Sequence, residues 1–222
     1  MGLPYLCNAL ITFPVVLISV LIFDKWYSGD SASVVIYKIG FHKTSLKNCL
    51  PGIFAAVSLL LMYPAMSLIF GFSIYLSDNW FMNLCGLFLT GGLAEEMFFR
   101  GFLFRHLRKN MSFKKAGITS MFLFSAIHLL LFAYMDFYIA LFSTMLAIAI
   151  SIPMSYFFER ADNTVWSAAI VHTVIRTIGL VVTVKEEDFM KFTLFWMICC
   201  MIIPLLIIIL NKNFRNAWKL KN

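Results

Sequence analysis

Charged side chains are scarce in this sequence, since Asp, Glu, Lys and Arg make up only 13% of it. A soluble domain carries about 25%. Hydrophobic residues make up 61%, and the mean hydropathy is +0.87. The apolar residues come in runs of about 20, the length at which a helix crosses a bilayer. This excludes a soluble globular protein. The alternating ten-residue segments of a membrane barrel are missing, so the spans are expected to be helical.

Patterns for disulfides and structural metals are also missing. The five cysteines form no C-x-x-C pair and mostly fall within apolar runs, as small buried residues do. The sequence shows no internal repeat, no low-complexity segment and no separate soluble domain. Its first apolar run lacks a basic n-region and an A-x-A-like cleavage site, so we expect a retained span. We predict one membrane domain over residues 1–222, with a motif-bearing core at 80–184 between flanking spans at 1–79 and 185–222.

Seven apolar segments predict an all-α fold, a polytopic helical bundle with about seven transmembrane spans. They are roughly Leu3–Phe23, Leu50–Leu76, Trp80–Phe104, Ala116–Tyr134, Phe137–Phe158, Thr164–Val184 and Phe189–Leu210. Basic residues gather in alternate loops, at 24–49, at 105–115 and in the tail that ends with Lys219 and Lys221. The positive-inside rule then places the N-terminus outside and the C-terminus in the cytoplasm.

The net charge of +7 is explained by these loops facing anionic lipid, and it does not indicate a nucleic-acid partner. The chain is rich in Lys, Asn, Ile and Phe and has no organellar targeting segment. This composition favours a multi-pass protein of a bacterial plasma membrane.

Few ionisable residues fall inside the predicted spans, and each costs about 2.5–3.5 kcal/mol to insert. They are Glu95, Glu96, Arg100, His128, His172 and Arg176. Counted from the cytoplasmic ends of three different spans, Glu95, His128 and His172 lie roughly 12–20 Å deep at 1.5 Å per residue. We therefore expect these three side chains to meet at one level near mid-membrane.

Helical spacing separates the two glutamates. Adjacent residues point about 100° apart, so Glu95 and Glu96 cannot face one small cavity equally. Glu96 and Arg100 are four residues apart, in the favourable order for an ion pair. Glu95 is then the candidate for a free carboxylate that acts as a general base on water. Taken singly, a Glu–Arg pair in a bundle is as readily explained by a structural role as by a catalytic one. A histidine within a membrane span often only forms a hydrogen bond to a neighbouring helix.

Three motifs in order strengthen the functional interpretation. Glu95-Glu96-x-x-x-Arg100, Phe124-x-x-x-His128 and His172-x-x-x-Arg176 resemble the motif set of the CPBP family, the CAAX prenyl endopeptidases and bacteriocin-processing (Abi) membrane proteins. The resemblance covers about Gly91 to Thr177. It implies a metal-independent intramembrane glutamic endopeptidase, in which Glu95 activates water, His128 holds it and His172 contributes to an oxyanion hole. Glu96, Arg100 and Phe124 would support the site.

The third motif departs from the family pattern, which usually has Asn where this chain has Arg176. A guanidinium can donate to an oxyanion as an amide does. It can equally pair with Glu95 or Glu96 and quench the site.

Other functions stay open. Glu95, His128 and His172 could form a zinc site, although the sequence has no H-E-x-x-H and its histidines lie on different helices. The chain could also be a non-catalytic scaffold, or a bacteriocin-immunity or regulatory protein that retains the fold. A small proton-coupled transporter ranks last, because no inverted repeat is found. We expect no cofactor, and as partners membrane lipid and a hydrophobic or lipidated peptide substrate.

Overall fold

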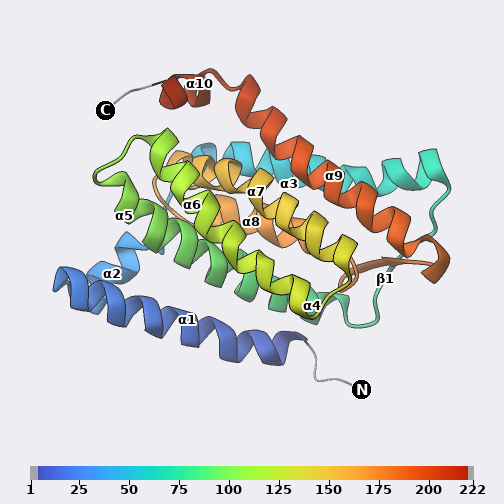
Figure 1. The fold of residues 1–222 in the computed structure, drawn as a ribbon, viewed down its shortest axis with the longest axis horizontal. Helices are drawn as coiled ribbons and strands as arrows, with labels where there is room; N and C mark the ends of the chain where they lie inside the picture. Colours follow the sequence, from blue (N-terminus) through green and yellow to red (C-terminus); the bar gives the residue numbers. More distant parts are fainter. Residues whose placement is uncertain (1–4, 220–222) are drawn as a thin grey trace.

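The structure is a computed structural model that describes residues 5–219. Leu3, the expected start of the first span, and Lys221 in the basic tail lie outside the described residues. The described chain forms a bundle of long helices (Figure 1). The α-helices are α1 (Tyr5–Ser28), α2 (Ala32–Lys38), α3 (Leu46–Phe70), α4 (Trp80–Leu87), α5 (Arg105–Arg108), α6 (Phe113–His128), α7 (Phe137–Arg160), α8 (Trp166–Ile175), α9 (Glu186–Leu210) and α10 (Lys212–Lys219).

Two π-helical stretches, η1 (Phe88–Glu95) and η2 (Met97–Phe104), join α4 to α5 in one continuous helical rod. A 3-10 turn, η3 (Leu129–Ala133), extends α6. Among residues 5–219, five helical segments are long and apolar enough to cross a membrane: α1, α3, α6 with η3, α7 and α9. Together with the rod, they make the chain a helical, multi-pass integral membrane protein, as the hydrophobic runs predict.

The segment Thr164–Val184 differs from the predicted full-length helical span. Its helix α8 ends at Ile175, so it is about 15 Å long at 1.5 Å per residue. The chain then turns at Gly179, where φ is +78°, and enters strand β2 (Val182–Val184). β2 pairs antiparallel with β1 (Ile74–Leu76), which follows α3. Over residues 5–219 the fold is therefore all-α apart from this small ribbon.

The irregular backbone after α8 makes its hydrogen bonds within the protein. Ser77 Oγ and Asn83 Nδ2 donate to the Leu180 carbonyl at 2.6 and 2.8 Å, and the Ser77 amide donates to the Val181 carbonyl. Non-helical backbone at membrane depth is tolerated only where protein or water satisfies it. Hydropathy alone did not separate this segment from a helix because the strand residues are as apolar as a span.

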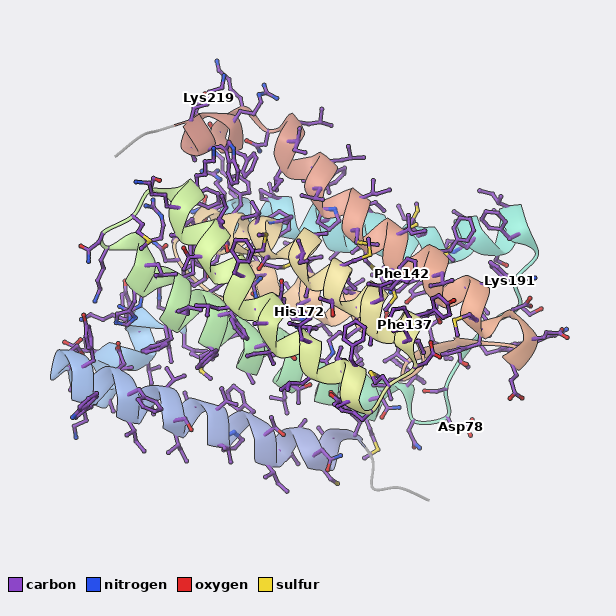
Figure 2. The ribbon with its side chains drawn as sticks, in the orientation of Figure 1. Asp78, Phe137, Phe142, His172, Lys191 and Lys219 are labelled. Carbon is purple, nitrogen blue, oxygen red and sulfur yellow. The ribbon has the colours of Figure 1, made fainter. Side chains whose placement is uncertain are left out.

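The long helices cross the bundle in alternating directions between two opposite faces, one of which carries α10. On one face, Arg108 of α5 pairs with Glu159 at the end of α7, and Phe214 of α10 packs against Phe113 and Tyr156. Figure 2 places Lys219 and Asp78 at opposite ends of the bundle. The segments on the α10 face contain Lys25, Lys38, Lys43, Lys47, Arg105, Arg108, Lys109, Lys114, Lys115, Arg160, Lys212, Arg215 and Lys219. The assignment of the α10 face to the cytoplasm and the count of seven spans both stay predictions.

The loop at 24–49 is partly helical on this same face, because α1 extends to Ser28 and α2 follows. Asp24 is fully buried, with Arg105 Nη2 at 3.1 Å and His106 Nε2 at 2.9 Å from its carboxylate. A second group of polar contacts fixes the link after α7. There the Asp162 carboxylate accepts hydrogen bonds from Asn48 and Thr44, which hold its pKa below the ordinary value.

Helix α8 lies at the centre of the bundle, and small residues let its neighbours approach it. A Cβ placed on Gly52 of α3 would come within 2.2 Å of Ser167 Oγ, and one on Gly92 of η1 within 2.6 Å of Thr173 Oγ1. Close approach through small residues is the usual way in which membrane helices pack. His172, in the last turn of α8, is consequently held in the interior of the bundle (Figure 2).

Two aromatic residues fix the C-terminal end of α8. The buried Trp196 of α9 donates from Nε1 to the Ile175 carbonyl at 2.9 Å. Its ring stacks at 4.2 Å on Tyr63 of α3, whose hydroxyl lies 2.6 Å from Thr177 Oγ1. The residue between these two anchors is Arg176, so α3 and α9 together position it.

Trp196→Phe should lower the free energy of unfolding by about 1–3 kcal/mol, because the buried Ile175 carbonyl then loses its donor. Thermal unfolding in detergent measures the change. Trp80→Phe is the control, because Trp80 is exposed and its replacement should change stability by no more than about 0.5 kcal/mol. Equal melting temperatures for wild type and Trp196→Phe would show that this hydrogen bond does not hold α8.

Candidate active site

Both glutamates lie where the helical rod from α4 to α5 is wound more widely than an α-helix. Glu95 ends η1, and Glu96 stands between η1 and η2. Hydrogen bonds from residue i to i+5 are rare in proteins and are frequently found at functional sites. The sequence spacing predicted an α-helix here, so the π-helical backbone differs from that prediction. Glu96 and Arg100 still meet, with Arg100 Nη1 at 3.2 Å from Glu96 Oε1.

Glu96 is the centre of a sealed polar cluster. Glu96 and Arg100 are both 0% exposed. Glu96 Oε1 also lies 2.6 Å from His172 Nδ1, so one carboxylate oxygen accepts from an arginine and a histidine. Arg100 in turn donates from Nη2 to Ser151 of α7 at 3.4 Å, and its guanidinium lies 4.7 Å from the centre of the Phe124 ring. The cluster therefore ties η2, α6, α7 and α8 together.

Glu95 lies in different surroundings, because its side chain is 32% exposed. Its Oε1 accepts from Arg176 Nη1 at 2.5 Å, and its Oε2 lies 3.7 Å from His172 Nε2. Arg176 Nη2 donates to the Tyr5 hydroxyl at 3.0 Å, and this hydroxyl lies 3.1 Å from Thr90 Oγ1. Glu95 is thus not the free carboxylate expected from helix geometry, since Arg176 holds one of its oxygens.

His128 ends α6 and is half-buried. Its Nδ1 lies 2.9 Å from the Phe124 carbonyl. A carbonyl only accepts, so Nδ1 carries the proton and, in the neutral ring, Nε2 is an acceptor. The Phe124 ring lies 4.7 Å from the His128 ring and 6.3 Å from the His172 ring, between centres. Phe124 is therefore the spacer between the two histidines.

These side chains border one cavity of about 810 Å³. Glu95, His128, His172 and Arg176 line it, together with Phe98, Phe99 and Phe124. Residues of α1, α6, α7 and α9 complete walls that are mostly apolar. The volume is typical of a small-molecule site. Glu96 and Arg100 are not among the lining residues, so the two glutamates are separated as their spacing predicts.

All seven residues selected from the sequence therefore lie in this region. Five of them line the cavity, and the other two, Glu96 and Arg100, form the sealed cluster behind it. Sequence reasoning missed the residues that join these groups to the other helices: Tyr5, Thr90, Ser151 and Trp196. A Ser, Thr or aromatic residue within a span is too common to give a signal. Only the tertiary contacts distinguish these four.

The side chains that could bind a zinc ion do not lie together. Within residues 5–219, no three His, Cys, Asp or Glu side chains form a group that could hold a metal. Two of the nominated ligands also have other partners, because Glu95 binds Arg176 and His172 Nδ1 binds Glu96. The residues as placed therefore do not fit the hypothetical zinc site at Glu95, His128 and His172.

Comparison with protein families gives one match. Residues 77–178, a little under half of the chain, match the family model described as type II CAAX prenyl endopeptidase Rce1-like. No curated protein and no solved structure matches. The matched segment begins before α4 and ends after Arg176, so it contains all three motifs. Residues 77–178 therefore carry the signature of the Rce1-like family, as their resemblance to the CPBP proteases predicts, within a multi-pass integral membrane protein.

Proposed function

We propose that this protein is an intramembrane endopeptidase that hydrolyses a peptide bond near a membrane-embedded or lipidated segment of its substrate, with a water activated by Glu95. One observation carries the proposal. A carboxylate and two imidazoles from three separate helices line a single apolar cavity, while the second glutamate is sealed behind them. The family match supports a protease in general terms.

Each side chain has a distinct task in the proposed reaction. Glu95 lines the cavity, and its Oε2, the oxygen not held by Arg176, acts as the general base. His128 accepts one hydrogen of the water through Nε2, since Nδ1 is committed to Phe124. His172 donates to the oxyanion from Nε2, while its Nδ1 is directed to Glu96 at 2.6 Å. Glu96 and Arg100 orient His172 and do not touch the substrate.

The proton balance closes on Glu95. The carboxylate removes a proton from water while the water oxygen attacks the peptide carbonyl carbon, giving a tetrahedral oxyanion. The carboxylic acid then returns the proton to the amide nitrogen as the C–N bond breaks. The products are a new carboxylic acid and a free amine, and the glutamate is regenerated. No step requires a metal ion or an oxidant.

Purified wild type should cleave members of a library of prenylated and unprenylated apolar peptides, in detergent and with a chelator present. Mass spectrometry identifies the products, and water enriched in ¹⁸O should place its label in the new carboxylate, as hydrolysis requires. The chelator should leave the rate unchanged. Activity lost with chelator and restored by zinc would overturn the glutamate mechanism.

A second candidate function is favoured by one observation, the ion pair between Arg176 and Glu95. A base that is held in this way fits a non-catalytic scaffold or a bacteriocin-immunity protein that retains the fold. The Arg176→Asn variant separates the two functions in the same assay. If both wild type and Arg176→Asn leave the whole library intact, the peptidase function is contradicted and the scaffold is favoured.

A further inference from the structure

We infer that Arg176 forms, with Tyr5, a subsite for a substrate carboxylate next to the scissile bond, and that this carboxylate displaces Glu95 from the guanidinium. The inference rests on the proposed function only in naming the ligand a substrate. It assigns specificity to the position at which the sequence departs from its family.

The guanidinium is built into the cavity wall. Arg176 follows the last residue of α8 and is 33% exposed there. On either side of it, Trp196 binds the Ile175 carbonyl and Tyr63 binds the Thr177 hydroxyl. Glycine at position 91 makes room for it, since a Cβ there would lie 2.6 Å from Arg176 Cδ and 2.7 Å from its Nη1. The position is therefore shaped for an arginine side chain.

The contacts of Arg176 do not use its full capacity for an anion. A guanidinium binds a carboxylate best through two parallel hydrogen bonds to both oxygens. Here Nη1 binds one oxygen of Glu95 at 2.5 Å, while Nη2 binds the neutral hydroxyl of Tyr5 at 3.0 Å. The second Glu95 oxygen is directed toward His172. An incoming carboxylate can take both Nη groups and improve on the present arrangement.

The cavity offers a ligand carboxylate a single cationic partner. Of the described residues that line it, Arg176 is the only Lys or Arg, and Glu95 is the only Asp or Glu. The remaining lining residues are mostly apolar, so a ligand carboxylate finds one strong partner there. Burial of that carboxylate without a cation would be costly. A carboxylate in this cavity must therefore compete with Glu95 for Arg176.

This competition links binding to the proposed chemistry. While Arg176 holds Glu95, the carboxylate is engaged in an ion pair and is a poorer acceptor for a water proton. A ligand carboxylate that takes the guanidinium releases Glu95 at the moment when the peptide is in place. A peptide without the carboxylate leaves the ion pair intact and is cleaved slowly.

Binding can be measured without turnover. The probes are fluorescent apolar peptides in phosphatidylcholine nanodiscs, prepared as one pair with a C-terminal carboxylate or amide. A second, amidated pair carries Asp or Asn, so that the two pairs distinguish a terminal from a side-chain carboxylate. Wild type should bind the carboxylate member of at least one pair roughly tenfold or more tightly than its neutral match. Glu95→Gln should tighten carboxylate binding further, because the competitor is removed, and should leave the neutral peptides unchanged.

Two variants at the subsite complete the test. Arg176→Asn should bind both members of each pair equally, and Gly91→Ala should weaken the carboxylate preference without any change of charge. In the cleavage assay, Arg176→Asn should raise KM for the carboxylate peptide and increase the rate on its neutral match. An oxyanion role would instead lower kcat on every peptide.

Equal affinities for carboxylate and neutral peptides, in both wild type and Glu95→Gln, would overturn the subsite. Glu95-dependent hydrolysis seen alongside that result would leave the proposed function standing. A carboxylate preference without hydrolysis of any peptide would contradict the proposed function and retain the subsite.

Discussion

Glu95→Gln should abolish peptide hydrolysis, lowering the rate by about 10²–10⁴-fold, while the protein stays folded. The amide keeps the shape of the side chain but cannot take a proton from water. The fold should persist because Glu95 is one-third exposed and its removal leaves Arg176 in contact with Tyr5 and the cavity. Product formation by mass spectrometry gives the rate, and thermal unfolding in detergent checks the fold.

A matched control comes from Glu159, a partly exposed carboxylate that pairs with Arg108 at the end of α7 and is not among the residues that line the cavity. Glu159→Gln should cleave peptides at the wild-type rate. Wild-type turnover by a well-folded Glu95→Gln protein would contradict the mechanism. Loss of activity in both variants would show that the assay responds to charge at the membrane surface.

The second large effect concerns stability. Glu96→Gln and Arg100→Met, tested singly, should each lower the free energy of unfolding by about 3–5 kcal/mol, since each leaves a fully buried partner charge without its counter-ion. For a chain of this size, the melting temperature should fall by roughly 6–20 °C. Denaturation followed by intrinsic fluorescence or by calorimetry measures the change.

The double variant Glu96→Leu/Arg100→Met should be more stable than either single variant, because it removes both charges and leaves neither unpaired. Recovery should stay incomplete, because His172 Nδ1 loses the oxygen that it contacts at 2.6 Å. The partly exposed pair Arg108–Glu159 provides the contrast, and Glu159→Gln should cost no more than about 1 kcal/mol. If Glu96→Gln melts with the wild type, the pair does not tie the four segments together.

The long helices were predictable because their apolar runs match the thickness of a bilayer. The short helix α8 was not, since Val181, Val182 and Val184 are as hydrophobic as helical span residues. The signal that could have separated them is a glycine followed by a β-branched run, which favours a strand. Helix α10 was missed as well, although Phe214, Ala217 and Trp218 have the spacing of an amphipathic helix.

Within the site, the sequence predicted the grouping of residues and left their partners open. Ion-pair spacing gave Glu96–Arg100 correctly, because both residues lie on one helix. The partner of Arg176 depends on how α8 meets η1, which is set by glycines at 91 and 92 that carry no signal in a single sequence. Tyr5 could not be predicted at all, since it reaches Arg176 from 171 positions away.

The two ion pairs also differ in how far apart their members lie in the sequence, and therefore in the time between the synthesis of one member and the other. Glu96 and Arg100 leave the ribosome almost together, so their helix can enter the bilayer with that carboxylate already neutralised. Arg176 follows Glu95 by 81 residues. At 5–20 residues per second, the cation arrives roughly 4–16 s after the carboxylate. During biogenesis the rod therefore carries Glu95 without its arginine partner until α8 has been made.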